Sequence, residues 1–167
     1  VFSTTRFEYL CGMKILMVCL GNICRSPLAD ALLRKKLSEL NLDIEVDSAG
    51  TSGYHIGNPP DIRTQEQAKK HQLDLSFLRA RQFKKEDFQT FDLIYVMDRT
   101  NQFNVLELAE TDEDRDKVKL LLNELPNESL NEVPDPYYSG ELGFEKVYEL
   151  LDAATNVIVK KIVEQAI

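Results

Sequence analysis

Residues 18–27 read Val18-Cys19-Leu20-Gly21-Asn22-Ile23-Cys24-Arg25-Ser26-Pro27. The apolar run Ile15-Leu16-Met17-Val18 leads into this stretch and is typical of a short buried strand. Proline is favoured in the first turn of a helix, because its missing N–H has no partner there anyway. Leucines at helical spacing follow it, namely Leu28, Leu32, Leu33, Leu37 and Leu40. The pattern predicts a strand, a tight loop and a helix N-terminus, where converging N–H groups and the helix dipole favour an anion.

Cys19 and Arg25 lie at the two ends of this loop, with five residues between them. If the loop curls into a nest of N–H groups, the sulfur lies at its centre and the guanidinium matches two phosphate oxygens at its rim. The positive field favours the thiolate, and Ser26 can donate a hydrogen bond to it. A thiolate facing a bound phosphate points to covalent phosphoryl transfer. The alternative is a buried structural cysteine beside a surface arginine, which the glycine, the proline and the strand-to-helix context disfavour.

The run from Cys19 to Pro27 resembles the signature of the low-molecular-weight protein tyrosine phosphatases. A cysteine and an arginine at this spacing occur in several phosphatase classes, but the Gly-Asn and Cys-Arg-Ser-Pro within the run are more specific. The resemblance covers the chain from Met13 onward and implies a four-stranded parallel sheet. It also implies that the phosphate is bound by Leu20, Gly21, Asn22, Ile23, Cys24, Arg25 and Ser26.

The composition excludes several classes of protein. A chain of 167 residues is long enough for one domain with a substantial core, and its apolar and charged fractions are those of a soluble globular protein. The net charge of −8 argues against nucleic-acid binding, and no apolar run approaches the length of a membrane span. Three cysteines do not make a disulfide framework and indicate a reducing, cytoplasmic location. His55 and His71 do not cluster with other ligands, so we expect neither a metal nor another cofactor.

Residues 1–12 do not show the pattern of a folded element. They mix polar and aromatic residues without a period and lack the apolar core of a signal peptide. We therefore expect them to be a disordered N-terminal extension or cloning remnant, with Met13 as the natural start. The phosphatase domain would then span residues 13–167.

The remaining pattern alternates strands and helices, which predicts a single-domain α/β fold. The sheet would be open, four-stranded and parallel, with helices on both faces and the phosphate-binding loop after the first strand. We expect strands over residues 15–18, 44–49, 91–97 and 118–121, and helices over 28–40, 61–72, 84–88, 100–109 and 144–162. Residues 50–60 and 126–140 are predicted loops, and 111–117 a charged turn.

Asp135 is the candidate general acid for leaving-group departure. It lies in Val133-Pro134-Asp135-Pro136-Tyr137-Tyr138, and the flanking prolines restrict the backbone on either side of it. The segment resembles the general-acid loop of the same family. Near aromatic residues and phosphate, the carboxyl group is expected to keep its proton available. The alternative is an aspartate that merely forms a turn.

The resemblance also implies a pocket and its supports. Tyr54, Tyr137 and Tyr138 would form walls for an aromatic ring, the alternative being ordinary half-exposed tyrosines. Ser48 and Asn22 would support the loop by hydrogen bonds, since asparagine tolerates the positive φ of a tight nest. Asp98 is a further candidate brace at the end of a strand. Leu78 departs from the pattern, because many relatives have a histidine there that joins the network around the asparagine.

The leading hypothesis is a cysteine-dependent phosphatase that acts on phosphotyrosine-containing proteins through a phosphocysteine intermediate. Arsenate reduction uses the same loop in related enzymes but needs further cysteines, and none follows Cys24. A phosphoarginine phosphatase tends to have a smaller polar residue at the position of Ile23 and a reduced aromatic wall. A non-catalytic phosphate-binding module would have no use for both Cys19 and Asp135.

Cys24 is open to two interpretations. It is either a small packing residue behind the loop or a thiol that captures an oxidised Cys19 as a disulfide. Disulfide geometry is demanding and does not follow from spacing alone.

Overall fold

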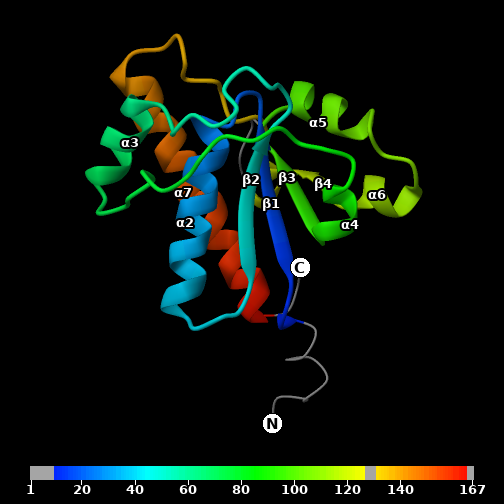
Figure 1. Cartoon of the computed structure of the whole chain (residues 1–167). Coiled ribbons are helices and arrows are strands. Elements are labelled where there is room, and N and C mark those ends of the chain that lie inside the picture. The colour runs from blue at the N-terminus through cyan, green and yellow to red at the C-terminus, as the bar shows by residue number, and fades with distance from the viewer. Residues whose placement is uncertain (1–9, 127–130, 165–167) are drawn as a thin grey trace.

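The computed structural model describes residues 10–126 and 131–164, and its centre is one sheet of four parallel strands (Figure 1). Their order in space is β2 (Glu45–Gly50), β1 (Lys14–Cys19), β3 (Leu93–Val96) and β4 (Val118–Leu120). After Lys14, β1 is an unbroken apolar run because it lies inside the sheet with both faces covered. The predicted four-stranded parallel sheet is thus confirmed.

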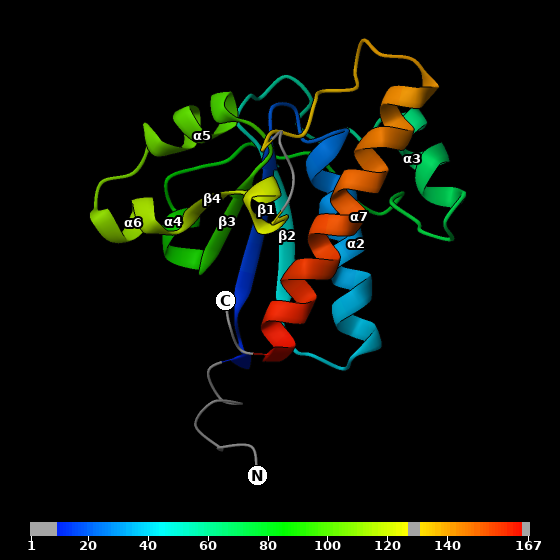
Figure 2. The same ribbon diagram turned by 180° about the vertical axis from the view of Figure 1, so that it is seen from behind.

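Different helices cover the two faces of this sheet (Figures 1 and 2). α2 (Arg25–Glu39) and α7 (Glu141–Glu164) pack together on one face, while α4 (Asp87–Thr90) and α5 (Arg99–Leu106) lie on the other side. The side chains of β1 alternate accordingly. Ile15 and Met17 join the core under α2 and α7, and Leu16 and Val18 join the core on the α5 side.

The carboxyl ends of the strands meet the loops that concern function. α3 (Ile62–Lys69) packs against α7 at this end of the molecule. The loop after β1 and the segment leading into α7 lie at the same end (Figure 1). Ligand sites of open parallel sheets occur at this end, outside the strand termini.

Three segments differ from their sequence-based expectations. The predicted charged turn at 111–117 is wrong, because residues Asp112–Asp116 form helix α6. Its cap is reciprocal: the Thr111 hydroxyl accepts a hydrogen bond from the N–H of Asp114, whose carboxylate accepts one from the N–H of Thr111. The expected helix at 84–88 begins later, as α4, because the Asp87 carboxylate accepts from the N–H of Lys84 and holds a turn there. The predicted fourth strand is cut short by a 3-10 helix, η1 (Leu121–Glu124).

Of the expected N-terminal extension, residues 1–9 lie outside the described residues. Leu10 packs against the core, and the N–H of Gly12 donates to the carbonyl of Asp43 at 3.4 Å. The boundary at residue 13 stays a prediction. Within 10–126 and 131–164, no helix combines the length and the apolar character needed to cross a bilayer.

Candidate active site

The loop between β1 and α2 has its backbone oriented by hydrogen bonds to neighbouring segments. Three carbonyls of the loop accept hydrogen bonds from backbone N–H groups outside it. The carbonyl of Cys19 accepts from Thr51 at 2.9 Å, and the carbonyl of Leu20 accepts from Ser52 at 2.9 Å. The carbonyl of Ile23 accepts from Asp61 at 2.8 Å. In a trans peptide, the C=O and the following N–H point in opposite directions. Carbonyls drawn outward therefore turn the next N–H groups inward, which is the arrangement that binds an anion.

Asn22 fixes the conformation at the middle of the loop. Its φ is 56°, in the left-handed region that asparagine tolerates better than most residues. Its side-chain Oδ1 accepts from the backbone N–H of Arg81 at 3.0 Å, which identifies the other amide atom as Nδ2. Nδ2 donates to the hydroxyls of Ser26 at 2.8 Å and Ser48 at 3.0 Å. Ser48 thus supports the loop by a hydrogen bond to Asn22, and Asn22 supports it by a further one to Ser26.

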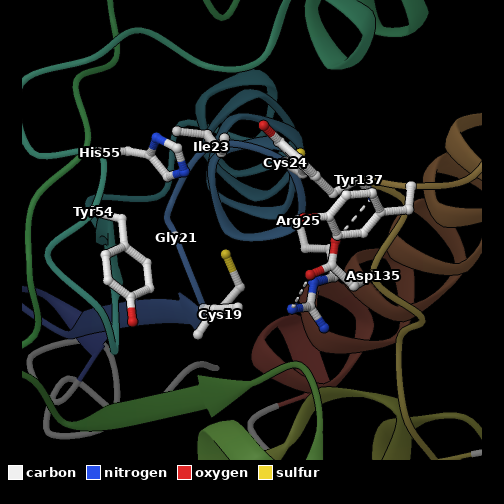
Figure 3. Close-up of a pocket in the computed structure, with 11 residues that line it drawn as sticks. Cys19, Gly21, Ile23, Cys24, Arg25, Tyr54, His55, Asp135 and Tyr137 are labelled. Atoms are coloured by element: carbon white, nitrogen blue, oxygen red, sulfur yellow. Dashed lines mark hydrogen bonds and ion pairs between the residues drawn. The ribbon is translucent and has the colours of Figure 1, made fainter.

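Cys19 ends β1 and its sulfur points into the pocket (Figure 3). The Ser26 hydroxyl lies 3.0 Å from the sulfur. Because the Ser26 oxygen already accepts from Asn22, its own hydrogen can be donated to the sulfur, a contact that would stabilise a thiolate.

Leu78 takes no part in this network. It packs against the core formed under α2 and α7. The side-chain oxygen of Asn22 accepts from a backbone group, the N–H of Arg81. All the hydrogen bonds of the Asn22 side chain are thus made without residue 78.

Arg25 is buried, with 2% of its side chain exposed, and is held by three oxygens. Its guanidinium donates to Asp98 at 2.7 Å, to the carbonyl of Val133 at 3.0 Å and to Asp135 at 3.5 Å. Burial works against its charge, but the nearby Cys19 and then Asp98 outweigh burial and raise the pKa of Arg25. Asp98 thus holds Arg25 in position through a direct hydrogen bond, whereas the sequence indicated only that it could brace the end of a strand.

Asp135 faces Arg25 from the loop that precedes α7 (Figure 3). One carboxylate oxygen accepts from the N–H of Tyr137 at 3.0 Å, and the other lies 3.5 Å from Arg25. The loop is anchored to the sheet where the N–H of Val133 donates to the carbonyl of Met97 at 2.8 Å. The side chain is 42% exposed, so the carboxyl group is open to both solvent and ligand.

These groups share a cavity of about 380 Å³, a size suited to a small ligand. Its lining residues are Cys19, Leu20, Gly21, Ile23, Cys24, Arg25, Tyr54, His55, Asp135, Tyr137 and Tyr138. The rings of Tyr137 and Tyr138 meet edge to face with centroids 5.0 Å apart. Tyr54 stands on the opposite side of the sulfur from Tyr137 (Figure 3). The three tyrosines expected at the pocket are all at its wall.

His55 is a lining residue that the sequence interpretation missed. A Cβ added at Gly21 would lie 3.0 Å from the His55 ring, so the imidazole packs closely on the phosphate loop. Figure 3 places it beside Ile23 at the pocket rim. The sequence feature that could have indicated His55 as a lining residue is its position directly after Tyr54 in the glycine-rich loop.

Cys24 is buried, packs with Ile23, Ala80 and Phe144, and is a free thiol, as is Cys19. Burial, followed by the charge of Asp61, raises the pKa of Cys24 to about 12. Cys24 is therefore protonated at neutral pH. In the part of the chain that the structure describes, no group of three or more histidine, cysteine or acidic residues is placed to hold a metal ion.

Residues 14–166 match the family model of the low molecular weight phosphotyrosine protein phosphatases. The chain belongs to this family. It is 45% identical over 139 residues to the human low molecular weight phosphotyrosine protein phosphatase. The matched region covers 81% of this chain and 87% of the human protein. As a member of the low molecular weight phosphatase family, the chain is a hydrolase of phosphoric monoesters.

Solved structures agree with this assignment. A protein tyrosine phosphatase of Entamoeba histolytica, with Hepes in its active site, superposes with a TM-score of 0.87 at 35% identity, over 93% of this chain and 99% of that one. A Drosophila arginine phosphatase superposes with a TM-score of 0.83 at 32% identity, over 89% and 96% of the two chains. The low molecular weight phosphatase fold therefore supports more than one named activity.

Proposed function

We propose that this phosphatase hydrolyses phosphotyrosine in proteins through a phosphocysteine formed on Cys19. The observation that carries the proposal is the shared pocket, in which Cys19, Arg25 and Asp135 lie within walls made of tyrosine. A reducing compartment such as the cytoplasm would keep the nucleophile available.

In the first step, the Cys19 sulfur attacks phosphorus while the bond from phosphorus to the phenolic oxygen breaks. Asp135 gives its proton to the departing oxygen. The loop N–H groups and Arg25 stabilise the charge on the remaining phosphoryl oxygens. In the second step, water attacks the phosphocysteine, Asp135 takes a proton from it, and the phosphorus–sulfur bond breaks. Water is the only co-reactant, and the second step restores the Asp135 proton and the Cys19 thiolate.

Cys19→Ser and Asp135→Asn test the two roles separately. The serine variant should lose turnover by far more than tenfold and still bind inorganic phosphate, because the loop N–H groups and Arg25 remain. The asparagine variant should be most impaired on aryl phosphates with basic leaving groups, which need the proton. Turnover of Cys19→Ser within tenfold of wild type, or an equal loss of Asp135→Asn on all leaving groups, would contradict these roles.

Phosphoarginine is the second candidate substrate, since the Drosophila arginine phosphatase shares this fold. Ile23 and Tyr137 at the pocket wall favour a phenyl ring over a polar guanidino group. The discriminating measurement is kcat/KM on otherwise identical peptides that carry phosphotyrosine, phosphoserine or phosphoarginine. We expect phosphotyrosine to be hydrolysed fastest, and a higher value for phosphoarginine would overturn the proposal.

A further inference from the structure

Arg63, in the first turn of α3, reaches across to the loop that carries Asp135. Its guanidinium donates to the carbonyl of Tyr137 at 2.9 Å. The same group lies over the ring of Tyr137, 5.2 Å from its centroid, and over the ring of Phe144, 4.7 Å from its centroid. One side chain thus contacts both the acid loop and the start of α7.

The other partner of Arg63 is Asp61, which connects it to the phosphate loop. The guanidinium donates to both carboxylate oxygens of Asp61, at 3.0 and 2.8 Å. Such a two-point contact fixes the orientation of the guanidinium plane. The backbone N–H of Asp61 in turn donates to the carbonyl of Ile23 at 2.8 Å. The pair is firm, because only 12% of the Asp61 side chain is exposed and the hydrogen bonds from Arg63 lower the pKa of Asp61.

A continuous path therefore joins the acid to the nucleophile loop without passing through Arg25. Asp135 accepts from the N–H of Tyr137, the carbonyl of Tyr137 accepts from Arg63, and Arg63 is held by Asp61. The direct contact between Asp135 and Arg25 is 3.5 Å long, at the limit of a hydrogen bond. The position of the acid therefore depends more on the Tyr137 peptide groups than on Arg25.

We propose that Arg63 is a positioning residue that holds the Asp135 loop over the pocket, where the carboxyl group can give its proton to the leaving-group oxygen. The inference rests on the proposed function, in which Asp135 protonates the leaving group. Arg63 does not line the catalytic cavity. It lines a neighbouring cavity of about 360 Å³ with Phe144 and other residues of α3 and α7, and it acts through Tyr137.

The test is a comparison of Arg63→Ala with Arg79→Ala on a series of aryl phosphates whose leaving groups differ in basicity. Arg79 is a matched control, because its guanidinium contacts carbonyls in its own turn, those of Ser76 and Leu78. We expect kcat/KM of Arg63→Ala to fall roughly tenfold or more for basic leaving groups and only a few-fold for acidic ones. Arg79→Ala should match wild type on both.

A double-mutant cycle with Asp135→Asn separates positioning from a general loss of structure. If Arg63 acts through Asp135, removing Arg63 should have little further effect once the carboxyl group is absent. The proposal would be overturned if the losses in kcat/KM of the two single variants added up fully in the double variant. It would also be overturned if Arg63→Ala lost the same kcat/KM for all leaving groups. A change confined to KM for peptides would also overturn it and identify Arg63 as a substrate contact.

Arg63→Lys provides the same comparison if the alanine variant does not fold. Lysine can donate to the Tyr137 carbonyl but cannot make the two-point contact with Asp61. The loss of kcat/KM in Arg63→Lys should therefore be smaller than in Arg63→Ala and should depend on the leaving group in the same way. The proposed function itself is judged on wild type and Arg79→Ala. If both are inactive on aryl phosphates, the proposed function fails, whereas the positioning role is judged only from ratios among active variants.

Discussion

Asn22 combines two properties that no other residue type offers at its position. It accepts a φ of 56°, and its amide places two donors and one acceptor among Ser26, Ser48 and the N–H of Arg81. The Ser26 hydroxyl next to the sulfur is oriented because its oxygen already accepts a hydrogen bond from Asn22. The polarity around Cys19 is therefore set by a side chain that does not line the cavity.

Asn22→Gly and Asn22→Ala should separate backbone strain from hydrogen bonding. Glycine keeps the positive φ and alanine does not, so the alanine variant should be less stable than the glycine variant by about 1 kcal/mol. Both lose the same hydrogen bonds, and both should show reduced kcat/KM. Urea denaturation and aryl phosphate kinetics provide the measurements. A glycine variant with the activity of wild type would mean that the side-chain hydrogen bonds are dispensable.

Cys24 is a protonated thiol close in sequence to an oxidisable one. If it captures the sulfenic acid of Cys19, peroxide inactivation should be reversed by a dithiol in wild type and should be largely irreversible in Cys24→Ser. Because its pKa is raised to about 12, capture should become faster as the pH rises. Activity recovery and mass spectrometry of the disulfide are the measurements. Equal recovery in both proteins would leave Cys24 as a packing residue.

At the scale of elements, α2 has two tasks that lie on different turns. Its first turn presents Arg25 to the site, and its next turn buries Asp30 completely against the sheet. Arg34 donates to Asp30 at 2.8 Å and also to the carbonyl of Val46 in β2. The Arg34 guanidinium thus connects the buried Asp30 side chain of the helix to the backbone of β2.

Asp30 should give the stability a distinct pH dependence. Burial, which outweighs the effect of Arg34, raises its pKa to about 6. The folded state keeps this proton to a higher pH than the unfolded state, so the contribution of Asp30 to stability falls as the pH rises through about 4 to 6. Relative to wild type, Asp30→Asn should therefore gain about 2 kcal/mol of unfolding free energy between pH 4 and pH 7.

Urea denaturation at both pH values measures this difference. Glu39→Gln, which changes an exposed carboxylate on the same helix, serves as the control. A constant difference between wild type and Asp30→Asn across the range would show that the pKa of Asp30 is not raised by folding.

The elements that depend on local pattern could be predicted from sequence, and those that depend on distant partners could not. The run from Val18 to Pro27 predicted strand, loop and helix together, and the two prolines around Asp135 marked a stiff loop. Helix α6 was missed although Thr111 and Asp114 have the spacing of a capping box. The roles of Asp98 and Arg63 follow from contacts across more than 70 residues of sequence, which no local pattern contains.

At the scale of the whole molecule, the net charge of −8 opposes the approach of an anionic substrate. The local field of the phosphate loop must overcome a repulsion that salt screens. For a phosphotyrosine peptide flanked by acidic residues, kcat/KM should therefore rise several-fold between about 10 and 150 mM sodium chloride. For a peptide flanked by lysines it should fall. Parallel salt dependences for the two peptides would mean that the overall charge plays no part in binding.

The active site joins parts of the chain that are made at different times. Arg25 contacts the carbonyl of Val133 and the carboxylate of Asp135, which are 108 and 110 residues further along the chain. During translation, Cys19 and the whole loop after β1 emerge from the ribosome long before Asp135, which lines the same cavity. α7, which follows Asp135, also closes the core beneath α2. Under the proposed function, a nascent chain therefore carries its nucleophile without a finished pocket around it, and the pocket is completed only when the last helix is made.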